Sequence, residues 1–252
     1  MVLSRQEKER YRRQILIFGE EGQERLKKAR ILIAGVGGLG SPVATYLAAA
    51  GVGHLLLVDH DCVERSNLNR QILHWEADIG KAKTQSAGEK LCQMNETIEI
   101  ETEQVTLTES TLGAYARRVD GIVDALDNFG TRYLLNRAAL AHRIPLFHGA
   151  IWGNDGQVTT IIPGKTVCLR CVFPHPPPGG EFPVIGTAPG VIGLIQANEV
   201  IKYLTGRGSL LENRLLLWNG ACSVLEEVAV SSSPHCIDCG KSRVNPVEKG
   251  ST

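Results

Sequence analysis

The chain has 252 residues, of which 43% are hydrophobic and 21% charged, a composition typical of a globular protein with one large domain or two small ones. Lysine plus arginine and aspartate plus glutamate both total 27, and the net charge of zero argues against nucleic acid or an acidic membrane surface as a partner. No apolar run approaches the ~20 residues of a membrane span, and the charged N-terminus lacks the apolar core of a signal peptide. We therefore expect a cytoplasmic protein, in which seven cysteines favour metal or thiol chemistry over a disulfide framework.

The first half of the chain alternates apolar runs with helical segments. A polar helical segment is expected at residues 5–29, with an interruption near Gly19–Gly22, and a glycine turn followed by a helix is expected at 35–51. Strands are predicted at residues 30–34, 54–59, 98–107, 121–128 and 144–151, and further helices at 81–94, 108–118 and 131–143. Strands and helices in this rhythm predict an α/β fold with a doubly wound, mostly parallel, Rossmann-like sheet.

The second half of the chain has a different character. Residues 156–164 are expected to form an antiparallel strand, and residues 214–220 and 223–230 a final strand pair, which together make an antiparallel C-terminal extension. Between them, Phe173–Pro183 contains five prolines and is predicted to be a loop. Residues 190–206 are predicted to form a helix that ends at a glycine cap. The residues after Gly240 are expected to form a loose tail.

A glycine turn follows the first predicted strand. Gly35, Gly37 and Gly40 form the pattern GxGxxG and open a helix, so the backbone can approach a phosphate at the helix N-terminus. Asp59 ends the next strand, 19 residues after Gly40, where a dinucleotide fold places the acid that holds a ribose. The alternative is a tight turn without a ligand. The strand, the helix and the acid in this order predict a nucleotide site.

Two cations and two acids favour a triphosphate over a dinucleotide. Arg70 and Lys83 are expected to converge on the pocket, where they suit a triphosphate with pyrophosphate as the leaving group. Asp124 and Asp127 end a strand at the same sheet edge, where a carboxylate can hold Mg²⁺ against phosphates. Taken singly, either cation could instead form a solvated salt bridge.

Two CxxC pairs in the second half of the chain predict a closed four-thiolate zinc site with a structural role. The four expected ligands are Cys168, Cys171, Cys236 and Cys239. A redox CxxC and disulfides are the alternatives. The remaining cysteines are expected to be buried apolar residues: Cys62, Cys92 and Cys222. Cys62, which follows Asp61 close to the expected nucleotide, is also considered as a reactive thiol.

Several motifs together resemble one enzyme family. They are "RYRRQI", "GVGGLG", "VDHDCVERSNLNRQ", "IGKAK", "DALDN", "CLRC" and "HCIDC". In combination they resemble the MoeB/ThiF/HesA adenylyltransferases, bacterial relatives of the ubiquitin-activating enzymes. The resemblance implies that ATP activates the C-terminal glycine of a ubiquitin-like sulfur carrier protein, as in molybdopterin or thiamine biosynthesis. The carboxylate would attack the α-phosphate, pyrophosphate would leave, and a carrier acyl-adenylate would form.

The resemblance also implies roles for individual residues. Asp59 would hold the ribose, Gly38 would lie against the phosphates, and Asp127 would be linked to Mg²⁺. Arg13 would enter the site of a neighbouring subunit, so that a homodimer would complete the catalytic set of Arg13, Arg70, Lys83 and Asp127. The implied nucleotide-binding set comprises Gly35, Gly37, Gly38, Gly40, Asp59, Ser66, Asn67, Leu68, Asn69, Arg70, Gln71, Lys83, Asp127 and Asn128.

The resemblance further implies a division of one ThiF-type domain that spans residues 1–252. Residues 1–29 would be an N-terminal helical segment, 30–150 the nucleotide-binding core, 151–240 the carrier-binding and zinc region, and 241–252 the tail. No cysteine lies between Cys171 and Cys222, whereas many family members have one in this crossover loop. We therefore expect adenylation without a loop thioester and a separate sulfur donor. His175, in the same loop, is expected to be an exposed bystander.

Three other functions stay open at this point. Adenylation of a peptide terminus or of a tRNA base uses the same chemistry, although the neutral charge argues against tRNA. An NAD-dependent oxidoreductase would share the glycine turn, but the residues after Ala150 offer no evident hydride site. A nucleotide-binding scaffold without catalysis would not need Arg70, Lys83 and Asp127 together.

Overall fold

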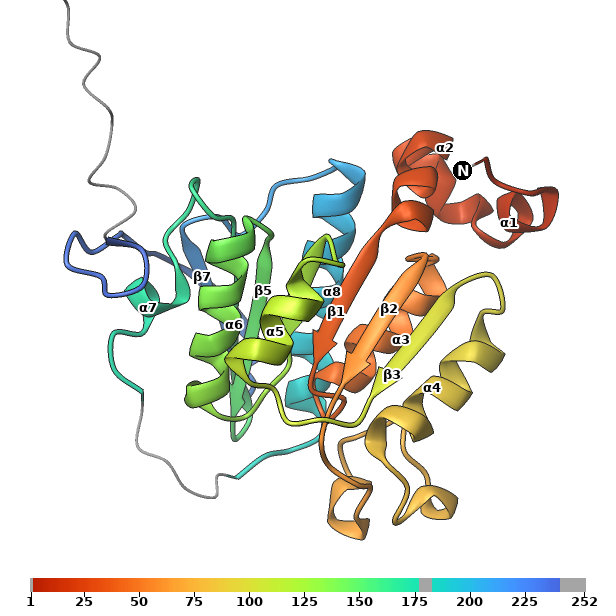
Figure 1. Cartoon of the computed structure of the whole chain (residues 1–252), viewed down its shortest axis with the longest axis horizontal. Coiled ribbons are helices and arrows are strands. Elements are labelled where there is room, and N and C mark those ends of the chain that lie inside the picture. The colour runs from red at the N-terminus through yellow and green to blue at the C-terminus, as the bar shows by residue number, and fades with distance from the viewer. Residues whose placement is uncertain (1, 177–182, 241–252) are drawn as a thin grey trace, which may run out of the picture.

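The computed structural model describes residues 2–176 and 183–240, which form one eight-stranded sheet in the order β3-β2-β1-β4-β5-β6-β7-β8 (Figure 1). The first five strands run parallel, and β6, β7 and β8 continue the sheet in antiparallel fashion. The strands are β1 (Arg30–Ala34), β2 (His54–Val58), β3 (Glu99–Glu103), β4 (Gly121–Asp124), β5 (Leu146–Trp152), β6 (Asp155–Ile161), β7 (Arg214–Asn219) and β8 (Val224–Ala229).

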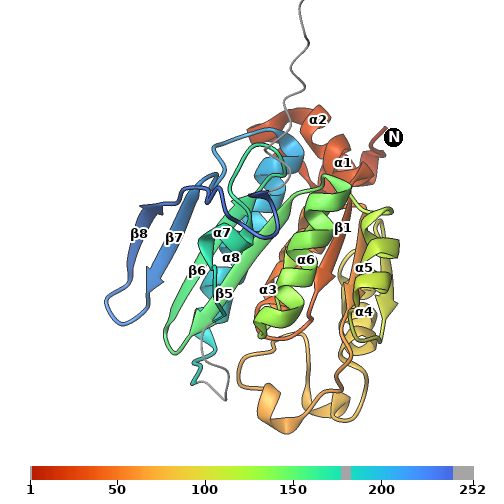
Figure 2. The same cartoon turned by 60° about the vertical axis from the view of Figure 1, so that its left-hand side comes forward.

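Helices cover both faces of the parallel part of the sheet. The helices α3, α4 and α8 lie on one face and α5 and α6 on the other, whereas β7 and β8 extend beyond them (Figure 2). The helices are α1 (Arg5–Arg10), α2 (Arg12–Lys28), α3 (Gly40–Ala50), α4 (Lys83–Met94), α5 (Glu109–Ala116), α6 (Phe129–His142), α7 (Leu169–Val172) and α8 (Thr187–Thr205), with 3₁₀ turns at Arg65–Asn67 and Glu76–Asp78. None of the described helices combines the length and apolar character that crossing a bilayer requires.

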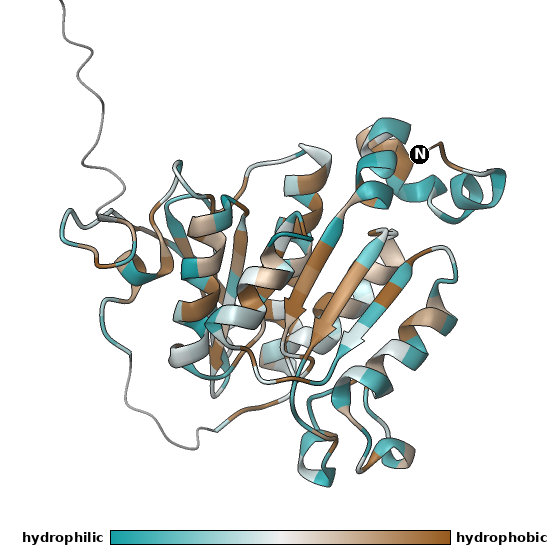
Figure 3. Cartoon of the chain, in the orientation of Figure 1, coloured by the Kyte–Doolittle hydropathy of each residue, from teal (hydrophilic) through white to brown (hydrophobic). Residues whose placement is uncertain are grey.

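The apolar runs form strands because the sheet buries them on two sides. Successive residues of a strand point to opposite faces. Ile31 and Ile33 of β1 pack in one hydrophobic cluster with Leu47 of α3, and Leu32 packs in a second cluster with Leu135 of α6. The central strands are accordingly the most hydrophobic part of the ribbon (Figure 3).

The order of the strands places the site. Ala34, the last residue of β1, pairs with Val58 of β2 and with Asp124 of β4, so the three strands end at the same level. The chain runs from β1 outward through β2 and β3 and then returns to β4 on the other side of β1. Ligands of open α/β sheets bind at such a reversal, beyond the carboxyl ends of the strands.

The structure confirms the predicted fold class and corrects several details. The expected interruption of the first helical segment occurs at Gly19, whose φ is 75°. The short α7 and the two 3₁₀ turns were not predicted, and the expectation of three buried cysteines is wrong. All three are exposed: Cys62 follows β2 in an isolated bridge with Ala82, Cys92 lies on the solvent side of α4, and Cys222 lies in the turn between β7 and β8. The expected tail after Gly240 and residues 177–182 of the expected loop lie outside the described residues.

Candidate nucleotide cleft and zinc site

A cleft of about 1770 Å³ opens at the carboxyl ends of β1, β2 and β4 and continues beside β5, β6 and β7. Most of the expected nucleotide-binding residues line it: Gly35, Gly37, Gly38, Asp59, Ser66, Asn69, Arg70, Gln71, Lys83, Asp127 and Asn128. Three members of the expected set do not line it, namely Gly40, Asn67 and Leu68. The side chain of Asn67 instead closes its own turn, since its Oδ1 accepts the Glu64 N–H at 3.1 Å.

The glycines shape the turn through close approaches. Gly35 has a φ of 91°, which favours glycine, and a Cβ there would lie 2.7 Å from the carbonyl oxygen of Ala125. A Cβ on Gly40 would lie 2.0 Å from the carbonyl oxygen of Gly35, so Gly40 allows α3 to start directly against the turn. Gly37 and Gly38 line the cleft itself and leave it open to a phosphate.

The carboxylate of Asp59 ties the glycine turn to the end of β2. Its Oδ2 accepts the Val36 N–H at 2.8 Å, and its Oδ1 accepts the Asp61 N–H at 2.9 Å. Each carboxylate oxygen can accept a further hydrogen bond, so both remain usable by ribose hydroxyls. Asp59 therefore both builds the turn and presents acceptors to a ligand.

The two cations of the cleft are held differently. The Nη1 of Arg70 donates to the Ser66 carbonyl at 2.8 Å and to Asn69 Oδ1 at 3.1 Å, and no carboxylate of the described chain forms an ion pair with it. Lys83 is buried, with its Nζ 2.7 Å from Oδ2 of the half-exposed Asp61. Within the described residues the charge of Arg70 is therefore uncompensated, whereas that of Lys83 is compensated by Asp61.

The acids after β4 separate into two roles. Asp127 is exposed and lines the cleft, and next to it Asn128 caps α6 by accepting the Thr131 N–H at 2.9 Å. Asp124 does not reach the cleft, contrary to the expectation. It is fully buried, with Oδ2 2.7 Å from His148 Nδ1 and Oδ1 3.6 Å from Arg132 Nε, because its side chain points from β4 into the interior.

Some cleft residues gave no sequence signal. Arg132 lines the cleft and donates from Nη2 to the Leu126 carbonyl, but a single arginine inside a helix has no diagnostic spacing. The outer cleft is lined by residues of the extension, which only the antiparallel pairing brings near the glycine turn: Trp152, Asp155, Gln157, Trp218, Asn219, Cys222 and Glu226. His175, expected to be an exposed bystander, is exposed but also lines the cleft.

Arg13 does not belong to the cleft of its own subunit. It is an exposed residue of α2, the helix that leads into the amino end of β1, and it does not line the cleft (Figure 1). Its expected part in catalysis therefore stays a prediction that requires a second subunit.

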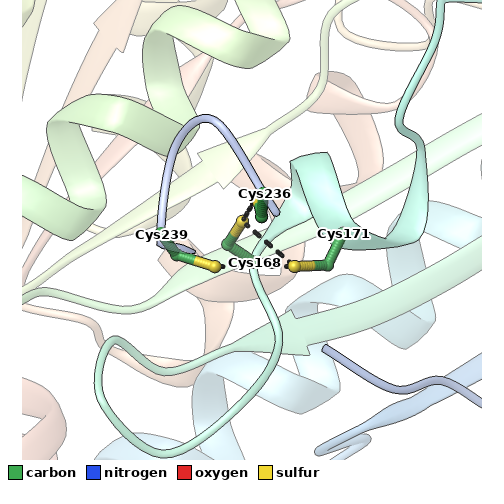
Figure 4. Close-up of side chains that lie close together, drawn as sticks. All are labelled: Cys168, Cys171, Cys236 and Cys239. Carbon is green, nitrogen blue, oxygen red and sulfur yellow. Dashed lines mark hydrogen bonds between the residues drawn. The ribbon is translucent and has the colours of Figure 1, made fainter. Parts of the chain in front are cut away.

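The four expected zinc ligands converge on one point (Figure 4). The Sγ–Sγ distances are 3.9 Å for Cys168–Cys171 and 3.5 Å for both Cys168–Cys236 and Cys171–Cys239. Thiolates at about 2.3 Å from one tetrahedral zinc ion lie about 3.8 Å apart, so the cluster fits zinc. Burial raises the pKa of the Cys168 thiol, and that of Cys239 to about 11. Zinc binding would displace these protons, since the thiolate is the ligand.

Side chains outside the cluster fix its two halves. Asn136 of α6 accepts the Leu169 N–H at 2.9 Å and donates to Asp238 Oδ2 at 2.7 Å, so it contacts both CxxC segments. Arg170 adds an ion pair to Asp238 at 3.7 Å. Such partners orient the ligands of a metal site and raise its affinity.

Comparison with solved structures supports the fold. Escherichia coli MccB, in a crystal structure with ATP, aligns with a TM-score of 0.82 at 24% identity over 92% of this chain and 74% of that one. PaaA aligns with a TM-score of 0.79 at 25% identity over 91% of this chain and 75% of that one. These likenesses define the class of fold.

The sequence comparisons identify the family. Residues 11–239 match the sequence model of the ThiF family, and the chain belongs to this family. It is 41% identical over 248 residues to the SAMP-activating enzyme E1 of Haloferax volcanii, covering 95% of this chain and 92% of that protein. It is 41% identical over 253 residues to the sulfur carrier protein adenylyltransferase of Thermus thermophilus, covering 95% and 93%. The predicted family and the predicted adenylyltransferase activity are thus confirmed.

A third relative is much longer. The adenylyltransferase and sulfurtransferase MOCS3 of Drosophila ananassae is 42% identical over 246 residues, which cover 94% of this chain but 54% of that protein. The chain therefore spans about half the length of this relative.

The zinc assignment predicts the metal content of two matched variants. We expect the purified protein to hold about one zinc ion per chain, measured by plasma mass spectrometry. Cys236→Ser should lose most of the metal and lower the melting temperature by on the order of 10 °C, because the C-terminal CxxC segment is no longer bound through zinc to Cys168 and Cys171. Cys222→Ser, which changes an exposed cysteine outside the cluster, should keep both values. Zinc-free wild-type protein with a Cys168–Cys171 disulfide would refute the assignment.

Proposed function

We propose that the chain uses ATP and Mg²⁺ to adenylate the C-terminal glycine of a ubiquitin-like sulfur carrier protein. The observation that carries this proposal is the guanidinium of Arg70 beside the glycine turn, which forms no ion pair with the described carboxylates, in a chain whose relatives are named adenylyltransferases. The names of two relatives point to SAMP and to sulfur carrier proteins as substrates of those enzymes. We place the reaction in the cytoplasm, with neither a membrane nor nucleic acid as a partner.

The reaction is a substitution at phosphorus. An oxygen of the glycine carboxylate forms a bond to the α-phosphorus of ATP, and the bond from that phosphorus to the bridging oxygen of pyrophosphate breaks. The carboxylate is already ionised near pH 7, so no general base is required. The barrier falls when the two reactants are held in line and when cations stabilise the charge that grows on the departing pyrophosphate.

The cleft residues divide this work. Asp59 holds the ribose, and the N–H groups of the turn at Gly37 and Gly38 receive phosphate oxygens. Arg70 and Lys83 neutralise the triphosphate, with Lys83 leaving Asp61 as the nucleotide arrives. The exposed Asp127 would hold Mg²⁺, which would supply positive charge that neutralises the phosphates.

The outer cleft receives the carrier tail. The space beside β6 and β7 is lined by the large side chains of Trp152 and Trp218, and it leads away from the glycine turn. We assign residues 30–150 to nucleotide binding and 151–240 to carrier binding and zinc. No cysteine occurs at positions 172–221, so we propose that the acyl-adenylate passes to a separate sulfur donor without a thioester on the crossover loop.

A homodimer would complete the site. Leu16 and Ile17 of α2 are 78% and 75% exposed and lie close in sequence to the exposed Arg13. A second subunit packed on this helix would bury apolar surface and could receive Arg13 in its cleft. The zinc ion in this proposal is structural and takes no part in the chemistry.

Arg70 and Arg65, five positions apart, should differ in their effect on catalysis. Arg70→Ala should reduce carrier-dependent exchange of labelled pyrophosphate into ATP by roughly 10²–10³-fold, the usual cost of removing a group that stabilises transition-state charge. Arg65→Ala removes an exposed guanidinium that pairs with Glu76 at 2.9 Å, and its exchange should stay within about twofold of wild type. Equal exchange in both variants, with folding intact, would contradict the role of Arg70.

The trans role of Arg13 predicts complementation between inactive variants. A heterodimer of one Arg13→Ala subunit and one Asp127→Ala subunit, purified through two different tags, contains one complete site if Arg13 acts across the interface. Its exchange activity should return to about half of wild type, because one of two sites is intact. A heterodimer as inactive as either homodimer would place Arg13 outside the partner's site.

A further inference from the structure

His74 is a buried residue that joins the glycine turn, the segment after Arg70 and α4. Its Nε2 lies 2.9 Å from the Val36 carbonyl oxygen in the glycine turn, and its Nδ1 lies 2.9 Å from Ser86 Oγ in α4. Its backbone N–H donates to the Gln71 carbonyl at 2.9 Å, in the segment that follows Arg70. The residue is only 3% exposed and does not line the cleft.

The partners of the ring fix its protonation. A carbonyl oxygen can only accept, so Nε2 carries a hydrogen that it donates to Val36. Burial lowers the pKa of His74, and the nearby cations of Lys90 and Lys83 lower it further against the opposing effect of the Val36 bond. The neutral ring therefore has Nδ1 as an acceptor, and the hydroxyl of Ser86 donates to it.

A buried ion pair holds Ser86 in this orientation. Lys90 Nζ donates to Ser86 Oγ and to the Ser86 carbonyl, both at 3.0 Å, and forms an ion pair with Asp78. The acceptor Nδ1 of the neutral ring lies 2.9 Å from the Ser86 hydroxyl, and the Asp78 carboxylate, whose pKa this hydroxyl lowers, is a second acceptor beside it. The contacts thus form a chain that links Asp78, Lys90, Ser86 and His74 to the Val36 carbonyl.

The last bond of this chain determines the direction of a phosphate donor. The Val36 carbonyl and the Gly37 N–H belong to the same trans peptide, in which the two groups point in opposite directions. When His74 holds the carbonyl, the Gly37 N–H must point away from the imidazole, and Gly37 lines the cleft. The Val36 N–H is held by Asp59, so both polar groups of Val36 are tied before any ligand arrives.

We propose that His74 is a positioning residue for ATP, which aims the Gly37 N–H at a phosphate and keeps the glycine turn in register with Arg70 and Lys83. This role rests on the proposed ATP-dependent function. His74 does not contact the reacting atoms, so it acts through Val36 and Ser86. Removing its donor frees the Val36–Gly37 peptide to rotate, and the affinity for ATP falls.

Two substitutions of His74 test its hydrogen bonds to Val36 and to Ser86 separately. His74→Gln keeps an N–H near the position of Nε2 and should bind Mg·ATP within about threefold of wild type. In His74→Asn the shorter side chain can contact Ser86 but not the Val36 carbonyl. This variant should bind Mg·ATP roughly tenfold more weakly, which is the effect of one lost hydrogen bond to a buried carbonyl. Binding is measured by calorimetry without carrier, and pyrophosphate exchange then gives the KM values for ATP and for carrier. A positioning role raises the KM for ATP in His74→Asn and leaves the KM for carrier unchanged.

A second buried histidine supplies the control. His54, at the start of β2, is 5% exposed, lies 3.3 Å from Glu101 and does not line the cleft. His54→Asn should lower the melting temperature without changing ATP binding. If His74→Asn does not fold, Ser86→Ala tests the same path, with an expected loss of about threefold in ATP affinity.

Each outcome bears on a defined claim. ATP affinities of His74→Asn and Ser86→Ala equal to wild type would overturn the role of His74, as would a parallel rise of both KM values. Wild-type protein that binds ATP but shows no carrier-dependent exchange would refute the proposed substrate, while the order of ATP affinities still decides the role of His74. Wild-type protein that does not bind Mg·ATP would overturn both proposals.

Discussion

The rest of the site depends on the guanidinium of Arg70, which forms no ion pair with any described carboxylate. The other lysine and arginine side chains that line the cleft are paired: Lys83 with Asp61 and Arg132 with Asp124. Within the described residues Arg70 is held by neutral oxygens, which fix its position without cancelling its charge. A guanidinium positioned in this way is prepared for an anionic ligand and needs little reorganisation when the ligand arrives.

The surrounding contacts serve the same purpose of preorganisation. Asp59 binds the turn from the end of β2, and His74 binds it from the segment between the two 3₁₀ turns, so the two polar groups of Val36 are fixed from different parts of the chain. The level ends of β1, β2 and β4 then bring the turn, Asp59 and Asp127 to one edge. Because these groups are already fixed in the free protein, less conformational entropy is lost when a ligand binds. The cleft is therefore a product of the sheet topology as much as of any motif.

The parts of the fold and of the site that could be predicted from sequence are those with a local signature. The apolar runs of β1 and β2, the GxGxxG turn and the paired CxxC segments each carry their information within a few residues. Asp124 was misjudged because strand position alone does not say which face a side chain occupies, and His148 and Arg132 enclose it only in three dimensions. His74 was missed because the Val36 carbonyl that it contacts lies far away in sequence, and Arg132 was missed because a single arginine inside a helix has no diagnostic spacing. The exposure of Cys222 depends on where the β7–β8 hairpin turns, which composition does not determine.

A crystal structure with Mg²⁺ and α,β-methylene-ATP would show whether the cations of the cleft bind the phosphates of ATP. We expect Lys83 Nζ to leave Asp61, Arg70 to leave the Ser66 carbonyl, and both to lie within about 3 Å of phosphate oxygens. A nucleotide bound in the cleft with Lys83 still paired to Asp61 and Arg70 turned toward solvent would contradict this role.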